Sequence, residues 1–127
     1  MNSAEIIAEL NELHPGARIK QLPEQNPTEI VCEFDPRDGH PEWSLAVAII
    51  DKSAPHFHKR ITETYTVIRG ELKLHVGNEE HTMYEGQSYH ITPPMIHWAE
   101  GDACWVEVYC SPGYTSEDHH LVAQASE

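Results

Sequence analysis

Nine prolines are spread along the chain, and the apolar residues between them fall in short runs or alternate with polar ones. Because proline interrupts a helix, this spacing excludes long helices after Pro15. Alternation with a period of two predicts strands with one buried face instead, and so an all-β sandwich or barrel. The predicted strands are residues 30–34, 44–50, 64–69, 71–76, 81–84, 88–91, 98–100 and 104–110, with a hairpin turn at Gly77-Asn78.

The segment before Pro15 has a helical pattern. Ile6, Ile7, Leu10 and Leu13 fall on one face of a helix over residues 4–13. Ser3 is its predicted N-cap, since a hydroxyl there can accept a hydrogen bond from a free backbone N–H. We expect this short helix to cover one end of the domain.

A length of 127 residues fits a single domain with its own core. We divide it into an N-terminal helix and arm (residues 1–29), a barrel (residues 30–113) and a polar C-terminal tail (residues 114–127). The sequence shows no repeat, linker or low-complexity segment between these parts. The tail has one apolar patch at residues 121–123 and is expected to be docked or frayed.

Acidic residues dominate the charge, with 21 Asp and Glu against 8 Lys and Arg and a formal net charge of −13. Such a chain repels phosphate backbones and anionic lipid, so we expect neither nucleic acid nor a membrane as a partner. Three sparse cysteines, Cys32, Cys104 and Cys110, argue against a disulfide scaffold and favour a reducing compartment. The first residues lack the pattern of a secretory signal, and we expect a cytoplasmic protein.

Ten residues are histidine, the commonest protein ligand for transition metals. His56 and His58 stand two apart, so in a strand both imidazoles point to one face. Glu63 and His97 can add a carboxylate oxygen and a third imidazole from neighbouring segments. These nitrogen and oxygen donors suit one divalent Fe, Mn, Ni, Co or Zn ion and do not select among them. The remaining histidines are expected at the surface: His14, His40, His75, His81, His90, His119 and His120.

The spacing of these four residues resembles the two motifs of the cupin superfamily. Residues 56–70 match the first motif, in which H-x-H is followed by Glu after three or four residues and by Gly after six more. Gly86 and His97 match the second motif, with Pro93 one place off. The similarity spans about residues 47–113, and the departures fall at turn or framing positions: Ile50, Thr92, Pro94 and Gly101.

The resemblance implies a double-stranded β-helix, a jelly-roll cupin barrel, with the short N-terminal helix added to it. It also implies that His56, His58, Glu63 and His97 bind the metal at one open end of the barrel, with sites left for water or substrate. A homodimer is a further expectation from the same resemblance.

Strand alternation identifies further candidates for the pocket. Tyr65 shares the face of Glu63 and is our candidate catalytic residue, as an acid, a base or a hydrogen-bond donor. Arg69 shares that face too and can hold a substrate carboxylate or phosphate. In the last strand Trp105 and Tyr109 lie on the face opposite Cys104, and the pattern does not decide which face lines the pocket. We take Arg69, Trp105 and Tyr109 as candidate substrate-binding residues.

These observations predict a metal-dependent enzyme acting on a small oxygenated metabolite. The favoured reaction is that of a sugar or organic-acid isomerase, epimerase or lyase, with the metal as Lewis acid. A non-haem iron dioxygenase of the cupin type is the second enzyme candidate. A module that binds a sugar or organic acid without chemistry is a candidate of another class, because the fold alone does not decide function.

Overall fold

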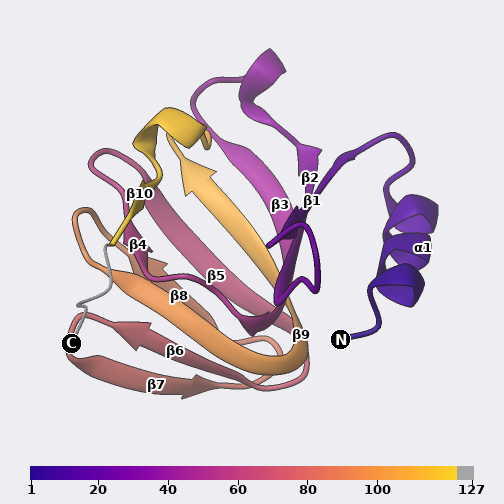
Figure 1. Cartoon of the computed structure of the whole chain (residues 1–127). Coiled ribbons are helices and arrows are strands. Elements are labelled where there is room, and N and C mark those ends of the chain that lie inside the picture. Colours follow the sequence, from indigo (N-terminus) through magenta and orange to yellow (C-terminus); the bar gives the residue numbers. More distant parts are fainter. Residues whose placement is uncertain (123–127) are drawn as a thin grey trace.

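The computed structural model describes residues 1–122 as a strongly curled antiparallel sheet with one helix on its outer side (Figure 1). Its elements are, in chain order, α1 (Ser3–Leu13), β1 (Arg18–Leu22), β2 (Glu29–Asp35), the 3-10 turn η1 (Arg37–Gly39), β3 (Ser44–Lys52), β4 (His56–Phe57), β5 (Thr62–Arg69), β6 (Leu72–Val76), β7 (Glu79–Met83), β8 (Ser88–Ile91), β9 (His97–Ser111), the 3-10 turn η2 (Ser116–Asp118) and β10 (His120–Leu121). The last five residues of the predicted tail, 123–127, lie outside the described residues. No helix within residues 1–122 has the length and apolar character needed to span a bilayer.

The long strand β9 organises the sheet, because it pairs with β3, β4, β5 and β6. Its first part pairs with β6 as far as Gly101, and its second part pairs with β3 from Cys104 and with β5 from Trp105 onward, while Lys52 of β3 also pairs with Glu100. Between them the strand bends at Ala103, whose φ is +48°. The two strands predicted at residues 98–100 and 104–110 are therefore one strand that runs through both halves of the curl, and the double-stranded β-helix is confirmed.

The inner face of the curl forms the main apolar core. Tyr65 and Val67 on β5 meet Cys104 and Val106 on β9 and the side chains of β6 there. Trp105, on the opposite face of β9, belongs to a second core beneath α1. The face of the last strand that carries Cys104 is thus the one that lines the barrel.

Helix α1 covers the outer face of the sheet and not an end of the barrel, which corrects the expected position. Ile6 and Leu10 are buried against β2, β3 and β9, whereas Leu13 is exposed. The N-cap is Asn2 and not Ser3, since the Asn2 side chain accepts a hydrogen bond from the Glu5 N–H.

Three strands were not predicted. Strand β1 has the mixed sequence RIKQL and pairs with β2 as an edge strand. Strands β4 and β10 are only two residues each and pair with one another, so the described part of the C-terminal tail is docked on the barrel. Docking of this tail brings its side chains to the mouth of the barrel.

Candidate metal centre

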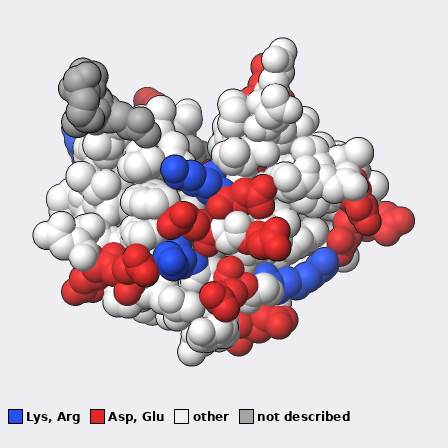
Figure 2. Space-filling view, turned by 60° about the horizontal axis from the view of Figure 1, so that its bottom comes forward, with Lys and Arg blue, Asp and Glu red and all other residues white. Residues whose placement is uncertain are grey.

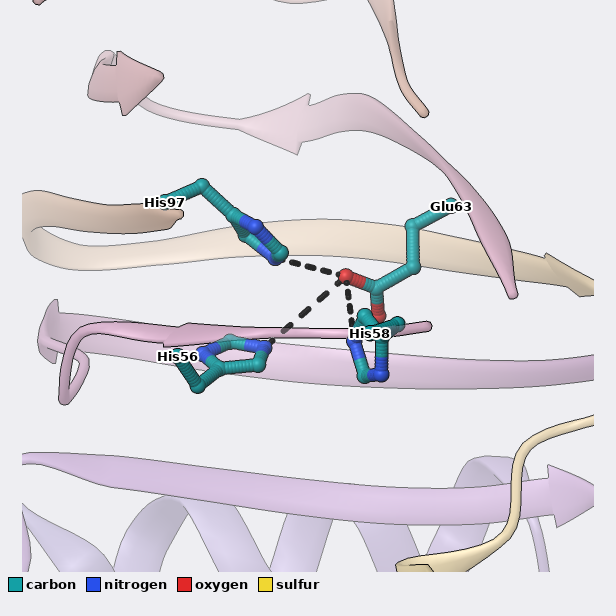
Figure 3. Close-up of side chains that lie close together, drawn as sticks. All are labelled: His56, His58, Glu63 and His97. Atoms are coloured by element: carbon teal, nitrogen blue, oxygen red, sulfur yellow. Dashed lines mark hydrogen bonds and ion pairs between the residues drawn. The ribbon is translucent and has the colours of Figure 1, made fainter. Parts of the chain in front are cut away.

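The four predicted ligands come together in one buried cluster (Figure 3). Their donor atoms all lie within 4.8 Å of one another. Glu63 Oε1 is 2.7 Å from His97 Nε2, 3.1 Å from His58 Nε2 and 3.9 Å from His56 Nε2. The carboxylate oxygen therefore lies where the three imidazole nitrogens converge.

The local strand pairing explains why these side chains meet. His56 on β4 and His97 at the start of β9 are directly paired, so their side chains are neighbours on one face. His58 is two residues further on and points to the same face. Glu63 reaches the cluster from β5, where the buried residues alternate with more exposed ones.

Each imidazole is held by its other nitrogen. The Nδ1 atoms of His56, His58 and His97 lie 3.0, 2.6 and 3.0 Å from the backbone oxygens of Ala54, Asp118 and Met95 respectively. Because a carbonyl only accepts hydrogen bonds, Nδ1 must be the protonated donor in all three rings. In the neutral rings this leaves the Nε2 lone pairs directed at the cluster, as in protein metal sites.

Electrostatics at the cluster favour a bound cation. Burial and then the neighbouring His97 lower the pKa of His56 to about 3, so this ring is neutral at pH 7. Burial would raise the pKa of Glu63, but the contacts with His58 and His97 outweigh it and hold the carboxyl ionised. Burial lowers the pKa of His58, but the contact with Glu63 raises it, and the net shift is upward.

The donor set also contains an atom that lacks a hydrogen-bond partner, as expected at a metal site. His58 Nε2 is buried and has no hydrogen-bond partner among the described residues. When the three rings are neutral, their Nε2 lone pairs and the carboxylate are all acceptors, and no proton is available to link them. A shared cation can interact with all four groups at once. The buried cluster therefore fits a divalent metal site, and the choice among Fe, Mn, Ni, Co and Zn stays open.

Comparison with known proteins identifies the family. The profile of the Cupin domain matches residues 47–109, the segment that contains all four cluster residues. The chain belongs to the cupin superfamily. No curated protein sequence matches this cupin.

Solved structures share its fold at low sequence identity. The nucleoside dehydratase Pac13 from Streptomyces is 12% identical over 89% of this cupin and 90% of its own chain, with a TM-score of 0.75. KdgF from Halomonas sp. is 16% identical over 82% of this cupin and 93% of its own chain, with a TM-score of 0.67. A cupin-2 domain protein from Rhodospirillum rubrum is 12% identical over 87% of this cupin and 78% of its own chain, with a TM-score of 0.71. These similarities concern the fold.

Of the other predicted site residues, only Tyr65 lies beside the cluster. It is buried on the inner face, and its ring centroid is 6.1 Å from that of His97. Burial and the charge of Glu63 raise its pKa well above the usual range, so the phenol is protonated.

The structure does not bring Arg69, Trp105 and Tyr109 to the cluster, and their predicted position is corrected. A bulge between Val67 and Arg69 breaks the alternation of β5, so Arg69 turns outward, pairs with Glu9 on α1 and lies 4.0 Å above the Trp105 ring. Trp105 and Tyr109 lie on the outer face of β9, where Tyr109 is partly exposed.

The C-terminal segment of this cupin supplies residues that the sequence reasoning missed. Asp118 is buried, and its carboxylate accepts hydrogen bonds from three successive N–H groups, of Lys59, Arg60 and Ile61. Those contacts outweigh its burial and lower its pKa to about 2. The same residue accepts the hydrogen bond from His58 Nδ1 through its backbone oxygen. Asp118 thus fixes both the turn after β4 and one ligand of the cluster.

His119 lies at the cluster and not freely at the surface, which corrects the expectation for this residue. Its ring stacks on His56 with 4.2 Å between centroids. The Tyr114 hydroxyl is 3.2 Å from His119 Nδ1, and the Tyr114 ring centroid is 6.4 Å from that of His58. No spacing rule connects residues 114–119 to 56–58, so only the fold reveals this pair.

A second carboxyl group, that of Glu29, also faces the barrel interior. Glu29 pairs with Ile50 in the sheet and so shares the inner face, half-buried. Within residues 1–122 it makes no side-chain hydrogen bond or ion pair. Burial and then the charge of Glu63 raise its pKa to about 7. An unpaired carboxyl in this position is a candidate for proton transfer.

Proposed function

We propose that this cupin is a metal-dependent enzyme that acts on a small oxygenated metabolite by isomerisation, epimerisation or elimination. The observation that carries the proposal is the arrangement of three imidazoles, each held by its Nδ1, around one ionised carboxylate. A metal bound there acts as a Lewis acid toward a carbonyl or hydroxyl oxygen. The substrate is a small molecule, and its oxygen atoms are the groups that such a site recognises.

Tyr65 is the proposed catalytic residue. Because its pKa is raised, the phenol keeps its proton at pH 7 and serves as a proton or hydrogen-bond donor, not as a base. Glu29, whose pKa is about 7, is the complementary group that can accept a proton from the substrate. A donor and an acceptor that face one interior are what isomerisation and elimination require.

The comparison with Pac13 supports the elimination branch of the proposal. That protein is a nucleoside dehydratase, and its structure was solved with uridine. Removal of water from a hydroxylated carbon skeleton needs an acid for the leaving oxygen and a base for the carbon-bound proton. Tyr65 and Glu29 are suited to these two roles.

The test begins with elemental analysis of the purified protein, for which we expect about one transition metal ion per chain. Protein loaded with each candidate metal is then incubated in D2O with hydroxy acids, sugars and nucleosides, and proton NMR follows exchange of carbon-bound hydrogen and the appearance of new double bonds. Tyr65→Phe should keep the metal and lower the rate by about 10²- to 10⁴-fold.

The outcomes separate the candidate functions. Oxygen consumption by iron-loaded protein with any of these compounds would replace the proposal by a dioxygenase. Saturable binding without exchange, elimination or oxygen uptake would indicate a binding module. Failure to retain any metal after reconstitution would remove the basis of the enzyme proposal.

A further inference from the structure

A cleft of about 420 Å³ lies between β1, β2, η1 and the C-terminal segment. Its lining includes Arg18, Lys20, Glu33, Arg37 and Tyr114. Here we call it the Arg37 cleft. It contains none of the four metal ligands, so the site described above does not account for it.

The cleft gathers basic residues in a strongly acidic molecule, and its formal charge is zero. Three of the 8 Lys and Arg residues line it, together with three acidic residues, whereas the chain as a whole carries 21 acidic residues. Elsewhere on the molecule acidic patches border the basic ones, as on the face in Figure 2. Because the cleft has equal numbers of basic and acidic residues, it repels anions less strongly than the rest of the molecule does.

The positive groups are also only partly neutralised. Arg18 Nη1 and Lys20 Nζ lie 3.2 and 3.5 Å from the same oxygen of Glu33, so two cations share one carboxylate. Within residues 1–122 the Arg37 side chain makes no hydrogen bond or ion pair. An exposed guanidinium with free N–H groups is suited to bidentate binding of a carboxylate or phosphate.

Tyr114 connects the cleft to the cluster. Lys20 Nζ lies 5.2 Å from the centroid of its ring on the cleft side. The hydroxyl of Tyr114 contacts His119, and His119 stacks on His56. Tyr114 and His119 thus form a continuous series of contacts from the cleft to His56 of the cluster.

We propose that the Arg37 cleft binds the anionic group, a carboxylate or phosphate, of the small molecule whose oxygen atoms reach the metal. This inference rests on the proposed function and narrows its substrate to anionic metabolites. Arg37 is the main binding group, with Lys20 and Arg18 as its partners, and Tyr114 lies between the anionic group and the reacting atoms.

The test uses inorganic phosphate and acetate as separate probes of metal-free, 15N-labelled protein. Saturable shifts of the amides of Arg18, Lys20, Arg37 and Tyr114 are expected, and the probe with the lower Kd identifies the preferred anion. Arg37→Gln should raise that Kd at least tenfold. Lys73→Gln, which removes one positive charge from β6 on another part of the sheet, should change it less than twofold.

A second measurement tests whether the cleft lies close to the metal. With Mn²⁺ in the cluster, the 31P relaxation of added phosphate should be enhanced relative to Zn²⁺-loaded protein, and Arg37→Gln should remove most of the enhancement. Shifts confined to other surfaces, or equal weakening by Lys73→Gln, would overturn the inference while leaving metal binding intact. Anion binding in a protein that retains no metal would instead leave the cleft assigned and reject the proposed function.

Discussion

At the scale of single residues, the Nδ1 contacts decide what the cluster can bind. Each imidazole donates to a backbone oxygen, so rotation of the ring and the choice of tautomer are fixed before any ligand arrives. A cluster prepared in this way needs little reorganisation to bind a cation. Replacing one ring removes both a donor atom and part of this preparation.

His58→Ala should therefore abolish metal binding but leave the barrel folded. Changes to residues that merely support a ligand cost about 10- to 100-fold in metal affinity, and loss of a ligand costs at least as much. Metal content by elemental analysis and far-UV circular dichroism check the two parts. His90→Ala is the matched control, since His90 is exposed on β8 and contacts Thr64. Unfolding of His58→Ala in the absence of metal would show that this residue mainly supports the fold.

Glu29 predicts a pH dependence of stability. Its pKa is raised from 4.5 to about 7, so between these pH values the folded state holds a proton that the unfolded state has released. The free energy of unfolding must then fall as pH rises through this window. Glu29→Gln should remove about 1–3 kcal/mol of that fall.

Urea unfolding of metal-free protein at pH 5.0 and pH 7.5 measures the effect of Glu29. Subtracting the values for Glu29→Gln from those for the unchanged protein cancels the titration of the histidines, which both share. Equal pH dependence of the two proteins would place the Glu29 carboxyl in solvent and withdraw its proposed role as a base.

At the scale of elements, one side chain makes three of the hydrogen bonds that hold the C-terminal segment. The Asp118 carboxylate accepts three backbone hydrogen bonds, and the two-residue strand β10 adds little pairing of its own. Asp118→Ala should destabilise the protein by about 2–4 kcal/mol, since it leaves buried donors unsatisfied. It should also weaken metal binding about 10- to 100-fold, because the backbone oxygen that accepts the hydrogen bond from His58 Nδ1 is no longer held in place by the carboxylate.

Thermal unfolding and metal titration test the role of Asp118. Glu117→Ala, at the neighbouring exposed position of η2, provides the control and should change stability by less than about 0.5 kcal/mol. If Asp118→Ala alters stability but not metal affinity, the segment stabilises the fold without preparing the cluster.

The elements also show how far sequence reasoning reaches. Most of the strands of the barrel could be predicted because period-two alternation is a local signal, and the four residues of the cluster because their spacing resembles the cupin motifs. Arg69 was misplaced because one bulge reverses the face of every later residue in a strand. Asp118 and His119 were missed because their contacts join positions about 60 residues apart, and no local pattern encodes such a contact.

At the scale of the whole molecule, metal binding and folding are thermodynamically linked. A ligand at 100 times its Kd adds about 2.7 kcal/mol to the stability of the folded state, which raises Tm by several degrees. Protons compete with the metal for the imidazoles, and the raised pKa of His58 strengthens this competition as pH falls. The metal-induced rise in Tm should therefore be smaller at pH 5.5 than at pH 7.5.

Differential scanning calorimetry with and without metal at both pH values measures this linkage. His58→Ala should show no rise in Tm at either pH. A rise that is unchanged between pH 5.5 and pH 7.5 would mean that the metal does not bind through imidazole.

The homodimer stays a prediction for this molecule. Light scattering after size-exclusion chromatography should give twice the mass of one chain. Because a net charge of −13 opposes association, the dimer fraction should rise with salt.

The hydrogen bond between His58 and Asp118 has a consequence for biosynthesis. Asp118 leaves the ribosome 60 residues after its partner, so a nascent chain can curl into most of the sheet while one imidazole still lacks its acceptor. We expect tight capture of the ion to wait until Asp118 has been synthesised and has docked on the turn after β4.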